Sequence, residues 1–412
     1  MFYYIVRDLT TTSKEIVRSI DYVQALLVTE PIEVLQEIIN TLVHPSQKET
    51  LSEYLSAMST FLKYRYNLHV LETSDDCSSH DLRYALGRKS IFEHNDFKEK
   101  QGVTCNKCRF PFYVCNKIKN VIANMNDDDP SIPTHSILCE QTEDAIKVIN
   151  ESAKKFQLFM AHKARCTNQN LAISEIEEDM KRKYLEENNN DTRTIMISDY
   201  KMKFEPLSSR ETTYDHYGKR GISWHGFCLM YYQLEDIMKE DGSVIKKPIK
   251  YTIYMNQILS DSNKQDGLSV LGLLEAAMAQ ISEELPFITQ IVLQTDNATS
   301  YSNMYLLCGI PLLNIVFKNK KLRIAEFIHT ETQDGKTILD AFYARCMKFI
   351  RMYLAKMDAN KVKKICTAVE LAKALSHNGG IQNAMIQVLS TDRERALLIE
   401  KKFDTVMKSL QM

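Results

Sequence analysis

TIMISDYKMKF, residues 194–204, alternates apolar and polar side chains and predicts a β-strand. Two more strands are expected directly after it, because β-branched and aromatic residues are concentrated in 222–234 and 249–259. The polar turn KEDGS, residues 239–243, joins these two strands. The three segments together predict an antiparallel start to a β-sheet.

Helices and strands alternate after this start. Helices are expected over 268–285, 301–313 and 336–357, and strands over 288–294 and 321–328. Pro286 ends the first helix, and the strand after it is apolar enough for the centre of a sheet. The resulting order, βββαβαβα, is that of a ribonuclease-H-like α/β fold.

Three aspartates fall where they could share a site in such a fold. Asp199 lies in the first strand among apolar residues, so its charge needs a partner. Asp296 follows the 288–294 strand, and Asp340 lies in the first turns of the last helix. Converging carboxylates suit Mg²⁺ or Mn²⁺, and two such ions about 4 Å apart can drive displacement at phosphorus. The alternative is that these aspartates only begin turns.

Four motifs in this region carry a resemblance to a known class of proteins. DYKMKF (199–204), YGKRGISWH (217–225), QTDNATSY (294–301) and ETQDGKTILD (331–340) together resemble DDE/DDD transposases and retroviral integrases. The similarity is to transposase-derived proteins of multicopy eukaryotic DNA-transposon families, and it covers roughly residues 70–390.

The resemblance implies a function and a competing one. The first is a nuclear DNA nuclease or strand transferase that uses two Mg²⁺ or Mn²⁺ ions and acts on DNA as a homo-oligomer. The second is a catalytically inactive descendant that binds DNA or protein through a zinc module and helices.

The third acid of the set has two candidates. Glu331 lies 35 residues after Asp296 (331 − 296 = 35), a spacing similar to that of integrases, but it is expected in the loop after a strand. Asp340 is expected on the last helix, where integrase-like enzymes carry their final carboxylate. The resemblance therefore favours Asp340, and the alternative for Glu331 is a solvated loop acid.

Length and composition predict several domains. A chain of 412 residues with 44% hydrophobic residues can bury more than one core, since single cores stop growing near about 250 residues. The expected parts are an N-terminal helical region (1–75), a Cys/His module (76–125), a linker with a long helix (126–190), the ribonuclease-H-like domain (191–358) and a C-terminal helical segment (359–412).

Net charge and hydropathy argue against two classes: a uniformly basic DNA-coating protein and a secreted or membrane protein. The net charge of −1 excludes a uniformly basic DNA-coating protein, so DNA binding would depend on local patches. No apolar run is long enough for a signal peptide or a membrane span, so an intracellular, soluble protein is expected. Its ten cysteines are then expected to be thiols or metal ligands.

Two Cys/His pairs precede the predicted catalytic domain at a spacing typical of a structural Zn²⁺ site. They are Cys77-x2-His80 and Cys105-x2-Cys108, separated by 24 residues. Metal binding would stabilise a segment with few apolar residues. A redox role for CxxC is one alternative, and another is that one ligand is replaced by Cys115, Cys139, His94 or His135. The family that the motifs resemble carries the pattern CxxHC at this place. Here Asp81 replaces the last Cys of that pattern, which argues against a second metal ion.

Basic residues that could contact DNA phosphates lie in two places. Those near the first strand and hairpin are Lys201, Lys203, Arg210, Lys219 and Arg220, and those in the long helix are Lys163 and Arg165. A solvated charged face is the alternative for both groups.

His162, Cys166 and His225 are further candidates for a functional role. His162 and Cys166 are one helical turn apart, although a metal would need two more ligands. His225 could reach the acids, whereas Trp224 is expected to pack in the hairpin.

Overall fold

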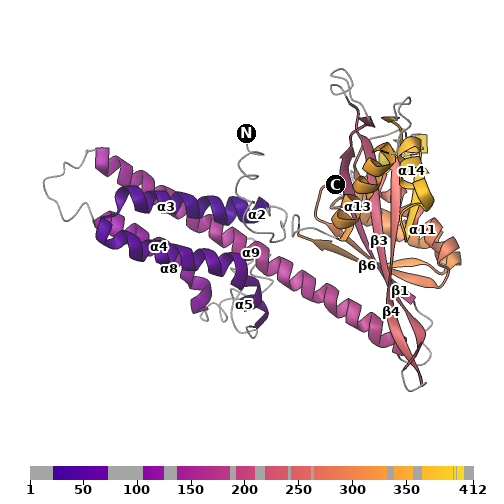
Figure 1. The fold of residues 1–412 in the computed structure, drawn as a ribbon, viewed down its shortest axis with the longest axis horizontal. Coiled ribbons are helices and arrows are strands. Elements are labelled where there is room, and N and C mark those ends of the chain that lie inside the picture. The colour runs from indigo at the N-terminus through magenta and orange to yellow at the C-terminus, as the bar shows by residue number, and fades with distance from the viewer. Residues whose placement is uncertain are drawn as a thin grey trace. The chain divides into compact units, whose positions relative to one another are not determined.

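The computed structural model describes residues 22–72, 105–124, 137–185, 192–208, 219–239, 243–260, 264–331, 338–355, 364–392, 394–395 and 397–402. This part of the chain is mixed α/β, with a helical N-terminal region followed by a six-stranded, mostly parallel sheet (Figure 1). It divides into two compact units, Met1–Gln169 with Gln333–Gly335, and Asn170–Thr332 with Lys336–Met412. No helix among the described residues is long and apolar enough to cross a membrane.

The first unit is built from helices around one apolar core. They are α2 (Tyr22–Gln24), η1 (Ala25–Thr29), α3 (Glu30–Leu42), α4 (Pro45–Thr60), η2 (Phe61–Arg65), α5 (Tyr66–Glu72), α8 (Asn106–Asn124) and the first part of α9 (Ile137–Leu185). Pro31 is the second residue of α3, and Pro45 is the first residue of α4, where a missing N–H costs nothing. Leu35, Ile118 and Phe156 are fully buried in the shared core.

Helix α8 belongs to the part of the expected Cys/His module (76–125) that the structure describes, residues 105–124. The described end of that segment is a helix whose Cys108, Val114 and Ile118 belong to the same core as α3 and α4. Residues 105–124 therefore contribute to an apolar core shared with the neighbouring helices, which their own composition does not reveal.

The second unit contains the sheet, in the strand order β6-β5-β1-β3-β4-β8. Its strands are β1 (Thr192–Phe204), β3 (Ile222–Met238), β4 (Val244–Leu259), β5 (Ile288–Asp296), β6 (Arg323–Thr330) and β8 (Ala384–Leu389). The pairs β1–β3 and β3–β4 are antiparallel, whereas β1–β5, β5–β6 and β4–β8 are parallel. The antiparallel start predicted from sequence is present.

Helices cover both faces of the sheet. On one face, α11 (Gly267–Glu284) and α12 (Met304–Val316) pack on a core that includes Met196, Phe227 and Leu293. On the other face, α13 (Ile338–Ala355) and α14 (Ala368–Leu375) pack on a core that includes Ile197 and Trp224. Because side chains alternate along a strand, the residue two positions after Ile197, Asp199, faces α13.

The C-terminal segment 359–412 was predicted to be helical, and this is wrong for part of it. After α14, Gly379 and Gly380 adopt positive φ angles of 85° and 77° that reverse the chain. Residues 384–389 then form β8, which pairs in parallel with β4 at Tyr254↔Ala384. A six-residue, largely apolar run such as AMIQVL is ambiguous between strand and helix, and pairing with the edge of β4 decides it. β2 (Leu207–Ser208) and β7 (Lys364–Ile365) form a separate small ladder.

Candidate active site

Two of the predicted acids lie side by side on neighbouring strands. In the parallel register of β1 and β5, Ser198 pairs with Thr295, so Asp199 and Asp296 follow at the same level. Val292 packs on the opposite face of β5 from Leu293, which places Asp296 on the same face as Asp199. The two carboxylates therefore share one edge of the sheet, where β5 ends.

Helix α13 brings Asp340 towards these two acids. Tyr343, one turn after Asp340, donates a hydrogen bond of 2.8 Å from its hydroxyl to the backbone oxygen of Asp199. Residues three apart lie on the same side of a helix, so the side of α13 that contacts β1 also carries Asp340. The charge of Asp340 is close enough to raise the pKa of Asp199.

Gly226 makes this close approach of α13 possible. It pairs with Asp199 across β1 and β3, directly beneath the ring of Tyr343. A methyl group at this position would overlap the Tyr343 hydroxyl and would lie 3.3 Å from Cδ2 of Leu339. Glycine at this strand position therefore provides the space through which Tyr343 reaches the backbone of Asp199.

Gly226→Ala is expected to destabilise the protein by about 1–3 kcal/mol, because an added group in a packed site displaces its neighbours. Tyr343→Phe removes the atom nearest to the new methyl, so Gly226→Ala should cost less in that background. A double-mutant cycle by urea unfolding measures the difference. Gly272→Ala in α11 is the control, since its methyl would meet nothing within 4 Å and should be tolerated. Equal costs of Gly226→Ala in both backgrounds would contradict this account.

Both strand carboxylates are held where their charge is unfavourable. Burial, followed by the negative charges of Asp296 and Asp340, raises the pKa of Asp199 to about 7. Burial also raises the pKa of Asp296. A 3.1 Å hydrogen bond from the Ala298 N–H and the charge of His329 act in the opposite direction and lower this pKa. Among the described residues, no cationic side chain offsets the charge of Asp199. A divalent cation would supply that missing positive charge.

The three aspartates do not converge on one point. Among the residues that the structure describes, the only group of three ligand atoms that all lie within 4.8 Å of one another is formed by His69, Cys105 and Cys108. At least one pair of the three aspartates is therefore more than 4.8 Å apart.

Glu331 lies at the same edge of the sheet, directly after β6. Thr330, the last residue of β6, pairs with Asp296 of β5, and Glu331 follows it in a half-buried position. The structure thus places both candidates for the third acid near the strand carboxylates. The effect of Asp340 on the pKa of Asp199 favours Asp340.

His225 was expected as a possible partner of the acids, and this prediction is wrong. It pairs with Tyr200 and lies on the face that packs against α11 and α12. Its Nε2 is 3.0 Å from both Ser198 Oγ and the Tyr301 hydroxyl, and burial lowers its pKa to about 3. Alternation along β3 points it away from Asp199, and it remains neutral.

Trp224 packs in the sheet, as the sequence predicts. It is fully buried, and its Nε1 donates a 3.0 Å hydrogen bond to Asn256 Oδ1. Lys201 lies on the same face two residues after Asp199, with its Nζ 5.8 Å from the Trp224 ring centroid. Burial lowers the pKa of Lys201.

The other predicted DNA-contacting residues are more exposed or belong to the first unit. Lys203 and Arg220 are exposed and Lys219 is half-buried, whereas Arg210 lies outside the described residues. Lys163 and Arg165 are half-buried in the part of α9 that belongs to the first unit.

The predicted zinc ligands fall partly outside the described chain. Cys105 directly precedes α8 and Cys108 lies in its first turn, whereas Cys77 and His80 lie outside the described residues, as do His94 and His135. His162 Nε2 is 3.5 Å from Cys166 Sγ, but this pair belongs to no described group of three ligands.

His69 is the neighbour of Cys105 that sequence interpretation missed. Its Nε2 lies 3.1 Å from Cys105 Sγ, 36 residues away in sequence. The one feature of the sequence that could have indicated His69 is its position on an expected amphipathic helix, shortly before the Cys/His pairs.

Comparison with known proteins adds a family. A family model described as Domain of unknown function (DUF8701) matches residues 178–411, which includes every strand of the sheet and the three aspartates. No curated protein matches the chain.

Proposed function

We propose that this chain, which belongs to the family described as Domain of unknown function (DUF8701), is a metal-dependent DNA nuclease or strand transferase. The observation that carries the proposal is the arrangement of Asp199 and Asp296 on adjacent parallel strands, with Asp340 on a helix held against the same strand. Two half-buried carboxylates with raised pKa values, of which Asp199 has no cationic partner among the described residues, are a suitable donor set for Mg²⁺ or Mn²⁺.

The order of elements supports a ribonuclease-H-like domain. Apart from the two-residue strand β2, the chain runs βββαβαβα from β1 to α13, and β8 then extends the sheet next to β4. The resemblance of the acidic motifs to DDE/DDD transposases gives the same three positions a role in holding ions.

The chain's own residues would prepare the site for a phosphodiester. Asp199 and Asp296 would hold the ions, and Tyr343 fixes the backbone of Asp199 through its hydroxyl. When bound, two Mg²⁺ or Mn²⁺ ions would activate the attacking oxygen and stabilise the leaving oxygen. The covered face of the sheet would exclude bulk water from these carboxylates.

DNA is the proposed partner, contacted in the nucleus by a homo-oligomer. Lys201 would contact a phosphate next to the reacting one, and Lys203, Lys219 and Arg220 would contact phosphates farther along the backbone. Lys163 and Arg165 are proposed as contacts from the first unit. With a net charge of −1, binding would depend on these local groups and weaken steeply with salt.

The third acid provides the test of this proposal. Asp340→Asn is expected to reduce Mn²⁺-dependent nicking of supercoiled plasmid by about 100-fold or more, because α13 holds its carboxylate near Asp199. Glu331→Gln is expected to reduce nicking by less than about tenfold. Initial rates are compared at several Mn²⁺ concentrations, with chelated protein as the blank.

Two results would count against the assignments. A greater loss in Glu331→Gln than in Asp340→Asn would exchange their roles. Absence of nicking by the wild-type protein with Mg²⁺ and with Mn²⁺ would contradict the nuclease and favour an inactive descendant that binds DNA or protein.

A further inference from the structure

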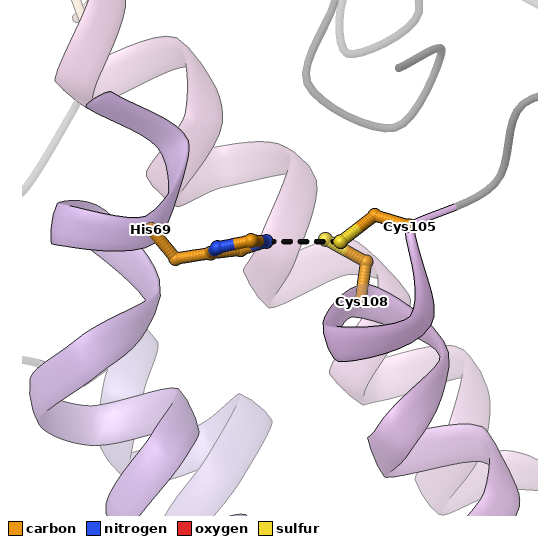
Figure 2. A group of neighbouring side chains, drawn as sticks. All are labelled: His69, Cys105 and Cys108. Atoms are coloured by element: carbon orange, nitrogen blue, oxygen red, sulfur yellow. Dashed lines mark hydrogen bonds between the residues drawn. The ribbon is translucent and has the colours of Figure 1, made fainter. Parts of the chain in front are cut away.

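We propose that His69, Cys105 and Cys108 bind a Zn²⁺ ion that joins α5 to the start of α8. Figure 2 shows the imidazole of His69 facing the two sulfur atoms from the opposite helix. All three residues belong to the first unit, so the proposal is independent of the acids in the sheet and of the proposed nuclease activity.

The distances suit a tetrahedral ion. His69 Nε2 is 3.1 Å from Cys105 Sγ, and the three ligand atoms lie within 4.8 Å of one another. Ligands of a tetrahedral Zn²⁺ with bonds of about 2.3 Å to sulfur and about 2.0 Å to nitrogen stand about 3.5–3.8 Å apart. The observed cluster spans this range, so small side-chain adjustments would admit the ion.

The start of α8 holds the two cysteines together. The Arg109 N–H donates to the Cys105 carbonyl at 3.1 Å, which makes Cys105 the N-cap residue immediately before α8. Cys108 follows three residues later and therefore lies on the same side of the first turn.

The chemistry of the three ligands selects the metal. Two thiolates and an imidazole suit Zn²⁺, whereas Mg²⁺ and Ca²⁺ require oxygen ligands. His69 is 5% exposed and Cys108 is 4% exposed, so an ion between them would be shielded from solvent. A shielded site of this kind is typical of structural zinc.

His69 also changes the ligand set predicted from spacing. A tetrahedral ion bound by His69, Cys105 and Cys108 has one position left. Cys77 and His80 therefore cannot both be ligands of the same ion. The helical core explains why spacing alone missed this, since His69 reaches Cys105 only because α5 and α8 pack together.

Metal analysis of the purified full-length chain tests the proposal. Wild-type protein is expected to retain about one Zn²⁺ per chain, and His69→Asn, Cys105→Ser and Cys108→Ser are each expected to retain at least about tenfold less after dialysis against a mild chelator. His69→Cys replaces one Zn²⁺ ligand with another, so it should restore binding. Cobalt-loaded wild type should show cobalt–thiolate absorption that is lost in Cys108→Ser.

Cys115→Ala is the matched control. Cys115 lies in the same helix and the same core, and burial raises the pKa of its thiol to about 12, so it should stay protonated and bind no metal. Full zinc retention in this variant would show that loss of a buried thiol alone does not remove the ion.

Two outcomes would overturn the proposal. One is undiminished zinc in His69→Asn, which would exclude His69 as a ligand. The other is a zinc-free wild type whose Cys105 and Cys108 form a disulfide, which would identify a redox pair. Restoration by His69→Cys separates loss of a ligand from loss of folding.

Discussion

Asp199→Asn and Asp296→Asn are each expected to abolish Mn²⁺-dependent plasmid nicking, with a loss of at least about 1,000-fold. The two side chains occupy equivalent positions on adjacent parallel strands, one residue after the pair Ser198 and Thr295. Asparagine keeps the shape of aspartate but loses the charge, so neither variant can hold the ions at the geometry that Mg²⁺ or Mn²⁺ requires.

Asp236→Asn is the matched control for these variants. It makes the same substitution in the same sheet, at an exposed position of β3. It should nick plasmid at the wild-type rate. Nicking that survives in both Asp199→Asn and Asp296→Asn would show that the activity belongs to a contaminant or to another part of the chain.

Asp199→Asn is also expected to stabilise the metal-free protein by about 2–4 kcal/mol at pH 8 and by little at pH 4. The pKa of Asp199 rises from 3.8 to about 7 on folding, so the folded state binds this proton more tightly than the unfolded state does. The contribution of Asp199 to stability therefore falls as the pH rises from about 4 to about 7. Asparagine carries no charge and removes this penalty.

The single tryptophan provides the measurement. Trp224 is fully buried beside Tyr343 and Lys201, so its fluorescence follows unfolding of the sheet rather than of the helical unit. Urea midpoints at pH 4 and pH 8 should diverge for Asp199→Asn relative to wild type, and stay parallel for Asp236→Asn. A stability gain of equal size at both pH values would contradict a cause in the ionisation of Asp199.

Addition of Mn²⁺ at pH 8 extends this measurement. Wild type should gain stability, because the ion offsets the carboxylate charges that destabilise the folded state. Asp199→Asn should gain much less, since it lacks one ligand. An equal gain in both proteins would place the bound ion away from Asp199.

Much of the sheet domain could be predicted from local patterns. Alternation in 194–204, helical periodicity in 268–285 and the stop at Pro286 each depend on a few neighbouring residues, and the structure has β1 and α11 in those places. The packing role of Trp224 could also be predicted from the sequence. Acids at strand ends were visible for the same reason.

Contacts between distant segments required the tertiary structure. The insertion of β5 next to β1, which brings Asp296 beside Asp199, joins residues almost a hundred positions apart. The strand β8 exists because the edge of β4 was open, and His225 turns away from the acids because β1 and β3 pair in one particular register.

The sequence by itself determined the order of strands and helices and the residue types available for chemistry, since both are encoded over a few residues. The tertiary structure decided which of those residues meet. The fit of Tyr343 over Gly226 and the approach of His69 to Cys105 depend on packing between helices and strands far apart in the chain. Such packing stabilises the folded state only when the whole unit is folded, so a local sequence pattern does not predict it.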